Sequence, residues 1–263
     1  MWDASCGSSA RSSSTSPSRS SELTDDFDVE RRVYGDHPSQ FVDLYTPANP
    51  RGMVISIHGG YWRATYGLDL NEPVARHLAA DGWLVSNIEY RRVTEDSIDG
   101  VWPEMSSDVL TAIGALPSAP GPTVLLGHSA GGHLALWAAA QPEVDVDGVI
   151  ALAPVSDLFL ADGLQLSNHA TNDLFGSSAA EQPDVYLAAS PLHLLPLAIP
   201  QLLVHGHEDE AVPIDMSIEY TETAELLGDD ITNIVERVDH FHVIDPAHDT
   251  WRSIDSWLGR LAG

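Results

Sequence analysis

The amino-acid sequence predicts a three-layer α/β fold with a mostly parallel central sheet and a small cap insertion. The first observation is size, because 263 residues with a hydrophobic fraction of 43% can bury one large core. The second is an alternation of short β-branched apolar runs with stretches of helical periodicity, which is typical of parallel βαβ units. The third is one long segment, at about 156–198, that interrupts this alternation.

The first 24 residues differ in composition from the rest of the chain. They are rich in serine and almost free of large apolar side chains. Such a segment cannot bury enough surface to offset the entropy of ordering, so we predict a disordered tail over residues 1–24 and a folded domain over residues 25–263. The domain opens with two predicted strands, 29–33 and 41–45, which the turn-forming segment 35–38 joins as a hairpin.

The remaining elements follow from the apolar runs and from the signals that start and stop helices. Strands are predicted over residues 53–58, 83–90, 122–126, 149–152, 200–205 and 231–238. Helices are predicted over residues 72–80, 103–116, 134–140, 214–227 and 246–261. The insertion at about 156–198 separates two core strands, and we expect it to cover the carboxyl edge of the sheet, where α/β folds bind ligands.

The charge balance excludes several classes of partner. The chain has 39 acidic and 12 basic residues, a formal net charge of −27 and a pI of about 4.4. A surface this negative repels nucleic acids and anionic membranes, so the expected partner is a small-molecule substrate. The sequence leaves open whether the chain is a monomer or a homodimer.

Cysteine usage and hydropathy bear on the compartment. The single cysteine, Cys6, excludes a disulfide within the chain and a metal site built from several cysteines. No apolar run approaches 18 residues, and the N-terminus lacks the apolar core of a signal peptide. The predicted location is therefore the cytoplasm.

A Gly-x-Ser-x-Gly motif follows the strand predicted at 122–126. It reads Gly127-His128-Ser129-Ala130-Gly131 and runs directly into a predicted helix. This strand–turn–helix context is that of a nucleophile elbow, in which small residues on either side of the serine permit a tight, strained turn. We therefore predict that Ser129 is a catalytic nucleophile, presented at the N-terminus of a helix.

A serine nucleophile needs a base that is oriented by an acid, and in this type of fold the acid and the histidine follow the serine in that order. Asp209 comes just after the strand at 200–205 and is the predicted acid, with Glu208 and Glu210 as alternatives in the same loop. His240 comes just after the last strand and is the predicted base, with His242 as its alternative.

The oxyanion of the reaction requires backbone N–H donors. We expect one from Ala130, which follows the nucleophile, and a second from Gly59 or Gly60 in the loop after the strand at 53–58. Tyr61 and Trp62 follow in the same loop, where they either line an aromatic substrate pocket or pack beneath the cap.

Arg63 comes next, and we expect an ion pair between it and a nearby acidic side chain rather than a substrate carboxylate. The string His205-Gly206-His207-Glu208-Asp209 has the beginning of a binuclear metal-site pattern. That pattern requires a histidine at position 210, but the residue there is Glu210, so no metal site is predicted.

Across residues 28–263 the sequence resembles the α/β-hydrolase superfamily. His-Gly-Gly-Tyr-Trp at 58–62 resembles the signature of kynurenine formamidases (arylformamidases) and related small esterases. Gly-His-Ser-Ala-Gly-Gly at 127–132 matches their elbow, and the segments 206–213 and 239–241 resemble their acid and histidine loops.

The resemblance implies a triad of Ser129, Asp209 and His240 and a hydrolase without a cofactor. It differs at His242, where an aspartate often follows the His-Phe pair in the family. The activity expected first is arylformamidase, which converts N-formylkynurenine to kynurenine and formate. The alternatives are a carboxylesterase that acts on small acyl esters and a non-catalytic binding member of the fold.

Overall fold

The computed structural model of the chain describes residues 26–97 and 100–263. The predicted tail over residues 1–24, which contains Cys6, lies outside the described residues. In the described part of the chain, no helix combines the length and the apolar character needed to cross a membrane.

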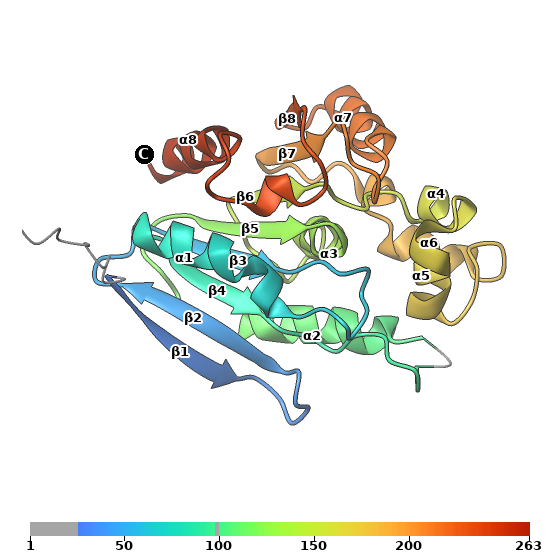
Figure 1. Cartoon of the computed structure of the whole chain (residues 1–263), viewed down its shortest axis with the longest axis horizontal. Helices are drawn as coiled ribbons and strands as arrows, with labels where there is room; N and C mark the ends of the chain where they lie inside the picture. Colours follow the sequence, from blue (N-terminus) through green and yellow to red (C-terminus); the bar gives the residue numbers. More distant parts are fainter. Residues whose placement is uncertain (1–25, 98–99) are drawn as a thin grey trace, which may run out of the picture.

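The described strands form one eight-stranded sheet in the order β1-β2-β4-β3-β5-β6-β7-β8 (Figure 1). The strands from β4 to β8 in this order run parallel, and β2 and β1 extend the sheet as an antiparallel hairpin, as predicted. The bounds are β1 Phe27–Val33, β2 Phe41–Pro47, β3 Met53–Ile57, β4 Leu84–Ile88, β5 Thr123–His128, β6 Gly148–Leu152, β7 Gln201–Gly206 and β8 Ile231–Glu236.

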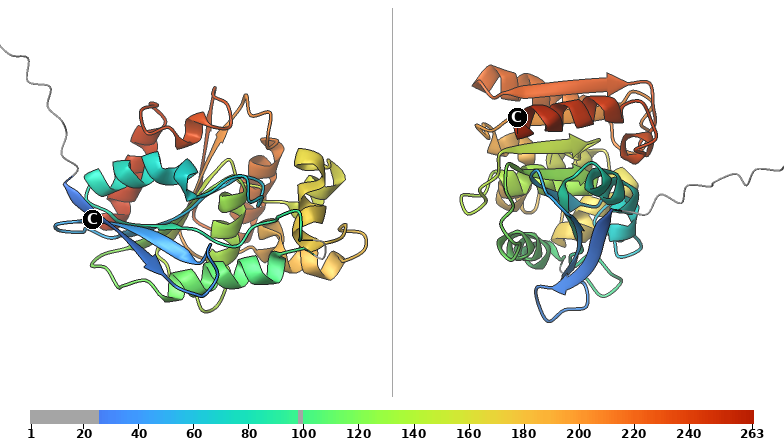
Figure 2. Two further views of the ribbon diagram at one scale, coloured as in Figure 1. Left: turned by 60° about the horizontal axis from the view of Figure 1, so that its bottom comes forward. Right: turned by 90° about the vertical axis from the view of Figure 1, so that its left-hand side faces the viewer.

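Helices cover both faces of the sheet, which gives the three layers that the sequence predicts (Figure 2). Apolar residues of α1 and α8 pack on one face, and those of α2, α3 and α7 pack on the other. The bounds are α1 Glu72–Ala80, α2 Trp102–Gly114, α3 Ala130–Ala139, α7 Asp215–Leu227 and α8 Trp251–Ala262. Strands β3, β4, β6 and β7 are buried along their whole length because both of their faces are covered.

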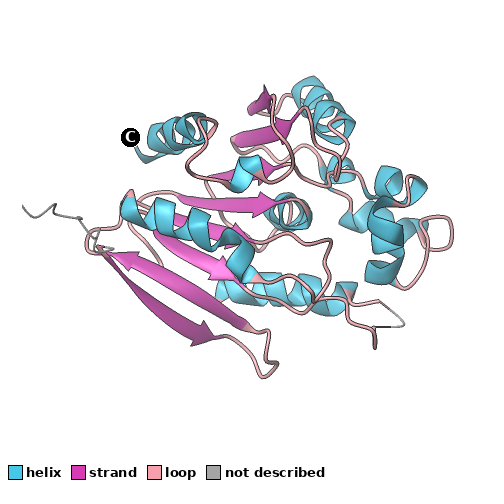
Figure 3. Cartoon of the chain, viewed as in Figure 1, coloured by secondary structure: helices cyan, strands magenta, loops and turns pink. Residues whose placement is uncertain are grey.

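The segment between β6 and β7 carries its own short helices: α4 Leu158–Gly163, α5 Leu166–Phe175, α6 Pro183–Ala189 and the 3-10 turn η2 Pro191–Leu194. They gather beyond the carboxyl ends of the central strands (Figure 3). Helix α4 begins where the Asp157 carboxylate accepts the N–H groups of Phe159 and Leu160. We call residues 156–198 the cap segment.

One local difference from the sequence prediction has a clear physical cause. The last helix begins at Trp251 rather than at residue 246. Before it, the Asp245 carboxylate accepts the N–H of Ala247 and the His248 ring accepts the N–H of Thr250. These side chains compete with the helical hydrogen bonds, so the chain forms turns there. The 3-10 turn η1, Leu68–Asn71, was not predicted.

Candidate active site

Ser129 stands at a sharp turn between the end of β5 and the start of α3. Its backbone has φ 56° and ψ −120°, a strained conformation for a residue with a side chain. The two motif glycines permit this turn. A Cβ at Gly127 would lie 2.0 Å from the Gly131 carbonyl oxygen, and a Cβ at Gly131 would lie 2.0 Å from that of Ile57. The turn therefore has the geometry that the motif predicts.

The final loop of the chain brings His240 to Asp209. The His240 Nδ1 atom lies 2.6 Å from the Asp209 Oδ2 atom. The two loops approach closely because residue 206 is a glycine, where a Cβ would lie 2.2 Å from the Val238 carbonyl oxygen. The alternatives point elsewhere: Glu208 and Glu210 are exposed. His242 is also exposed and pairs with Asp239 at 2.7 Å. Of the candidates, the structure brings Asp209 and His240 together.

Asp209 is fully buried as a side chain, but it is well supplied with donors. Its Oδ1 atom accepts the N–H groups of Ala211 and Val212, each at 2.8 Å. Burial by itself raises the pKa of this carboxyl, but the hydrogen bonds from His205 and His240 outweigh it and hold the pKa well below its usual range. Asp209 is therefore a carboxylate at neutral pH.

His128, the residue before Ser129, links the elbow to the final loop. Its Nε2–H donates to the His240 carbonyl oxygen at 2.9 Å, and the two rings lie 4.5 Å apart between centroids. Complete burial, with the nearby His240 ring, lowers the pKa of His128 to about 3, so its ring is neutral.

The contact between His128 and His240 places the His240 ring beside the elbow. Within the described residues, the Ser129 hydroxyl has no hydrogen bond to that ring. Catalytic hydrogen bonds are often long before substrate binds and tighten in the complex.

The glycine loop after β3 lies against the elbow. A Cβ at Gly59 would lie 3.0 Å from the Ser129 Cβ and 2.7 Å from the His128 carbonyl oxygen. Gly60 has φ 110°, which glycine adopts without strain. Among the described residues, no acceptor is found for the N–H groups of Gly59, Gly60 or Ala130. Donors without partners beside the serine are what an oxyanion site requires.

The buried His58, the first residue of the His-Gly-Gly-Tyr-Trp segment, holds this glycine loop in place. Both ring nitrogens of His58 face oxygen atoms: Nδ1 lies 2.7 Å from the Gly59 carbonyl oxygen and Nε2 lies 3.0 Å from Glu89 Oε1. The ring stacks on Tyr90 at 4.5 Å, and the Tyr90 hydroxyl donates to the His58 carbonyl oxygen. In the sequence His58 is the first residue of the His-Gly-Gly-Tyr-Trp segment, but nothing local indicates its contacts with Glu89 and Tyr90.

The residues after the glycines have mainly packing roles. Trp62 is 1% exposed, and its indole N–H donates to His133 Nδ1 at 3.2 Å, so this side chain packs in the core and does not line an open pocket. The Tyr61 hydroxyl donates to the Ala211 carbonyl oxygen. The expected acidic partner of Arg63 is Asp173 in the cap segment, at 2.9 Å.

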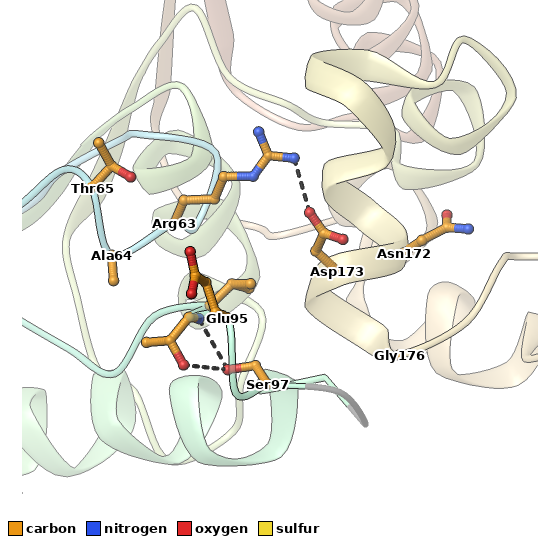
Figure 4. A pocket seen from close by; sticks show the side chains of 10 residues that line it. Arg63, Ala64, Thr65, Glu95, Ser97, Asn172, Asp173 and Gly176 are labelled. Carbon is orange, nitrogen blue, oxygen red and sulfur yellow. Dashed lines mark hydrogen bonds and ion pairs between the residues drawn. The ribbon is translucent and has the colours of Figure 1, made fainter.

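A cavity of about 710 Å³ lies between Arg63 and helix α5 (Figure 4). Seven of its ten lining residues are polar or charged, including Thr65, Glu95 and Asp173, and neither Ser129 nor His240 lines it. Over residues 26–97 and 100–263, no group of three or more His, Cys, Asp or Glu side chains is arranged to hold a metal ion.

The order of strands and the helices on both faces define an α/β-hydrolase fold. A solved structure, the truncated form of a carbohydrate esterase from gut microbiota, aligns with a TM-score of 0.73 at 19% identity, over 91% of this chain and 98% of that chain. The BD-FAE family model matches residues 42–223, which is more than half of the chain. The chain belongs to the BD-FAE family.

Two curated relatives extend the comparison. A probable isoprenylcysteine alpha-carbonyl methylesterase of Arabidopsis thaliana is 27% identical over 74% of this chain and 47% of its own length. A kynurenine formamidase of Salmo salar is 24% identical over 88% of this chain and 80% of its own length. The chain spans about half the length of the first curated relatives it matches.

Proposed function

We propose that this chain is a serine hydrolase that cleaves small carboxylic esters through an acyl-enzyme. The observation that carries the proposal is the Asp209–His240 pair, held against the strained elbow of Ser129 by the hydrogen bond from His128 to the His240 backbone. The family match and the methylesterase relative support ester substrates over amides.

In the proposed mechanism, His240 takes the proton of the Ser129 hydroxyl as the oxygen attacks the substrate carbonyl carbon. The negative charge that develops on the carbonyl oxygen is stabilised by N–H groups of Ala130 and of Gly59 or Gly60. Asp209 keeps the Nδ1 proton on His240 and stabilises the imidazolium.

The leaving alcohol then takes the proton from His240, which leaves the acyl group on Ser129. Water attacks this ester with His240 again acting as the base, and the carboxylic acid is released. No cofactor enters either half of this cycle.

Arylformamidase, the activity expected first from the sequence, is now the second candidate after the esterase. Its support is the kynurenine formamidase relative, which matches over most of both chains, and the His-Gly-Gly-Tyr-Trp segment at 58–62. The burial of Trp62 weakens the case for an aromatic pocket at this loop. The formamidase reaction uses the same attack, with formate as the released acid.

Two measurements test the proposal. A fluorophosphonate probe should label the wild-type chain at Ser129 and leave the Ser129→Ala variant unlabelled; an unlabelled wild-type chain favours a non-catalytic binding protein. The values of kcat/KM for p-nitrophenyl acetate and for N-formylkynurenine then separate the two activities. A higher kcat/KM for N-formylkynurenine than for p-nitrophenyl acetate would favour arylformamidase over the esterase.

A further inference from the structure

His205 lies at the end of β7, four residues before Asp209, and has no role in the catalytic steps proposed above. Its side chain is 0% exposed. The sequence places it in the string that begins like a metal site, but His207 of that string is exposed to solvent. Both nitrogens of the His205 ring face partners inside the protein. This buried titratable side chain therefore needs another explanation.

The contacts of the His205 ring define where its proton resides. Nε2 lies 3.0 Å from the Val212 carbonyl oxygen and 3.3 Å from Asp209 Oδ2. Both of these atoms only accept hydrogen bonds, so Nε2 carries the proton; its N–H donates to the Val212 carbonyl oxygen and also faces Asp209 Oδ2, whose pKa it lowers. Nδ1 lies 2.7 Å from the Ser217 hydroxyl of α7, which can donate to it. The neutral ring with its proton on Nε2 satisfies every one of these contacts.

The same contacts complete the surroundings of the Asp209 carboxylate. Oδ1 accepts two backbone N–H groups, from Ala211 and Val212. Oδ2 faces two imidazoles, with His240 at 2.6 Å and His205 at 3.3 Å. A buried carboxylate with donors on both oxygens has one preferred rotation, and the lone pair that it offers to His240 is fixed.

We propose that His205 is a positioning residue, which supplies the second donor to Asp209 Oδ2 and thereby holds the carboxylate in the orientation that binds His240. This inference rests on the proposed function, because it concerns the same triad. It describes a buried row in which Ser217 orients His205, His205 orients Asp209, and Asp209 orients His240. Neither His205 nor Ser217 touches the substrate.

Two amide variants of His205 separate its donor from its bulk. In His205→Gln the side-chain nitrogen reaches the position of Nε2, whereas in His205→Asn it reaches only the position of Nδ1. We expect kcat to fall by about 10- to 100-fold in His205→Asn with little change in KM, and to stay within about threefold of wild type in His205→Gln. A ring that matters only for packing predicts equal losses in the two variants.

A second measurement does not depend on turnover. The short Nδ1–H···Oδ2 contact of His240 should give a low-field proton NMR signal in the wild type and in His205→Gln, and exchange should remove it in His205→Asn. If His205→Asn does not fold, Ser217→Ala takes its place and should lower kcat a few-fold, by about 3- to 10-fold, because His205 loses the hydroxyl that fixes its tautomer.

The outcomes distinguish the two proposals. A wild-type chain that the fluorophosphonate probe does not label overturns the proposed function and the catalytic meaning of the row together. A labelled wild-type chain overturns only the role of His205 if His205→Asn keeps both its kcat and its low-field signal. Equal losses in the Asn and Gln variants also overturn that role.

Discussion

The elbow around Ser129 and the cap segment are held in place by different kinds of contact. The elbow is fixed by the backbone, since the motif glycines lie within contact of neighbouring carbonyl groups and leave no space for side chains. The cap segment is anchored by side chains, above all by Arg63. Its guanidinium donates to Ser167, to the Asn168 carbonyl oxygen and to the Asp173 carboxylate. Substitutions at the elbow should therefore cause large losses of stability, because the backbone cannot move aside. Substitutions of the side chains that anchor the cap segment should cause smaller losses, which depend on how many contacts are removed.

The largest effect is expected at the elbow itself. Ser129→Ala removes the attacking oxygen and should lower kcat by about 10⁴-fold or more, while thermal unfolding stays close to wild type. The cap variant Gly163→Ala, made in parallel, should keep its turnover. Steady-state kinetics with p-nitrophenyl acetate measure both. Turnover in Ser129→Ala near the wild-type rate would mean that another residue is the nucleophile.

Glycine-to-alanine changes compare the two regions directly. At Gly131 the added methyl group meets backbone carbonyl oxygens of β3 and its following residue, which cannot move without breaking the sheet. We expect Gly131→Ala to lower the free energy of unfolding by about 3 kcal/mol or more. At Gly163 in α4 nothing lies within 4 Å of the new methyl group.

Gly163→Ala should therefore change the free energy of unfolding by less than about 1 kcal/mol, on the stabilising side because alanine favours a helix. Urea denaturation of both variants gives the comparison. Similar losses at the two sites would contradict the distinction between backbone and side-chain anchoring.

Acid is expected to weaken both regions through buried histidines. His128 joins the elbow to the final loop, and His133 donates to the Ala189 carbonyl oxygen in the cap segment. Burial lowers the pKa of His128 to about 3 and that of His133 to about 4, from 6.5 in the unfolded chain. The unfolded chain binds these protons first as the pH falls, so stability is present above pH 6.5 and is lost towards pH 3 to 4.

Each of the two histidines should lower the free energy of unfolding by roughly 2 kcal/mol at pH 5. Urea denaturation at pH 7 and pH 5 measures the loss. His133→Gln carries no titrating group, so this variant should lose less stability than the wild type between the two pH values. An identical loss in the variant would show that folding does not lower the pKa of His133.

The same contrast explains what the sequence predicts and what it does not. The elbow is predictable because its determinants, Gly127 to Gly131, are adjacent in the chain and act through the backbone. Asp209 and His240 are predictable because each lies in the loop that follows a strand, and parallel strands bring their carboxyl ends to one edge. Position relative to the strands is also the only sequence feature that favours Asp209 over the neighbouring carboxylates and His240 over His242.

The supporting contacts were missed because they join side chains far apart in the sequence. His128 reaches the backbone of residue 240, and His58 reaches Glu89, through rotamers and tautomers that no local pattern encodes. One signal was available: His58, His128 and His205 each lie at the carboxyl end of a buried strand. Histidines at this edge are candidates for orienting a catalytic loop, even where they are buried.

Among the substitutions that remove an interaction, the smallest loss of stability is expected at the cap anchor. Arg63→Gln removes a charged donor from several acceptors of α5, including carbonyl groups of residues 167 and 168 in a left-handed backbone. It should lower the free energy of unfolding by about 1 to 2 kcal/mol. Asp173→Asn only neutralises one half-exposed partner of Arg63, so its effect should be less than about 1 kcal/mol.

Arg252→Gln is the matched control for the anchor, because Arg252 and its partner Asp249 are both largely exposed and their ion pair is screened by water. We expect no measurable change in its urea midpoint. Labelling of Ser129 should proceed in all three variants, since the elbow does not depend on the cap anchor for its shape. Loss of labelling in Arg63→Gln alone would show that the cap segment also fixes the glycine loop. The conformation of the active site would then depend on the cap segment.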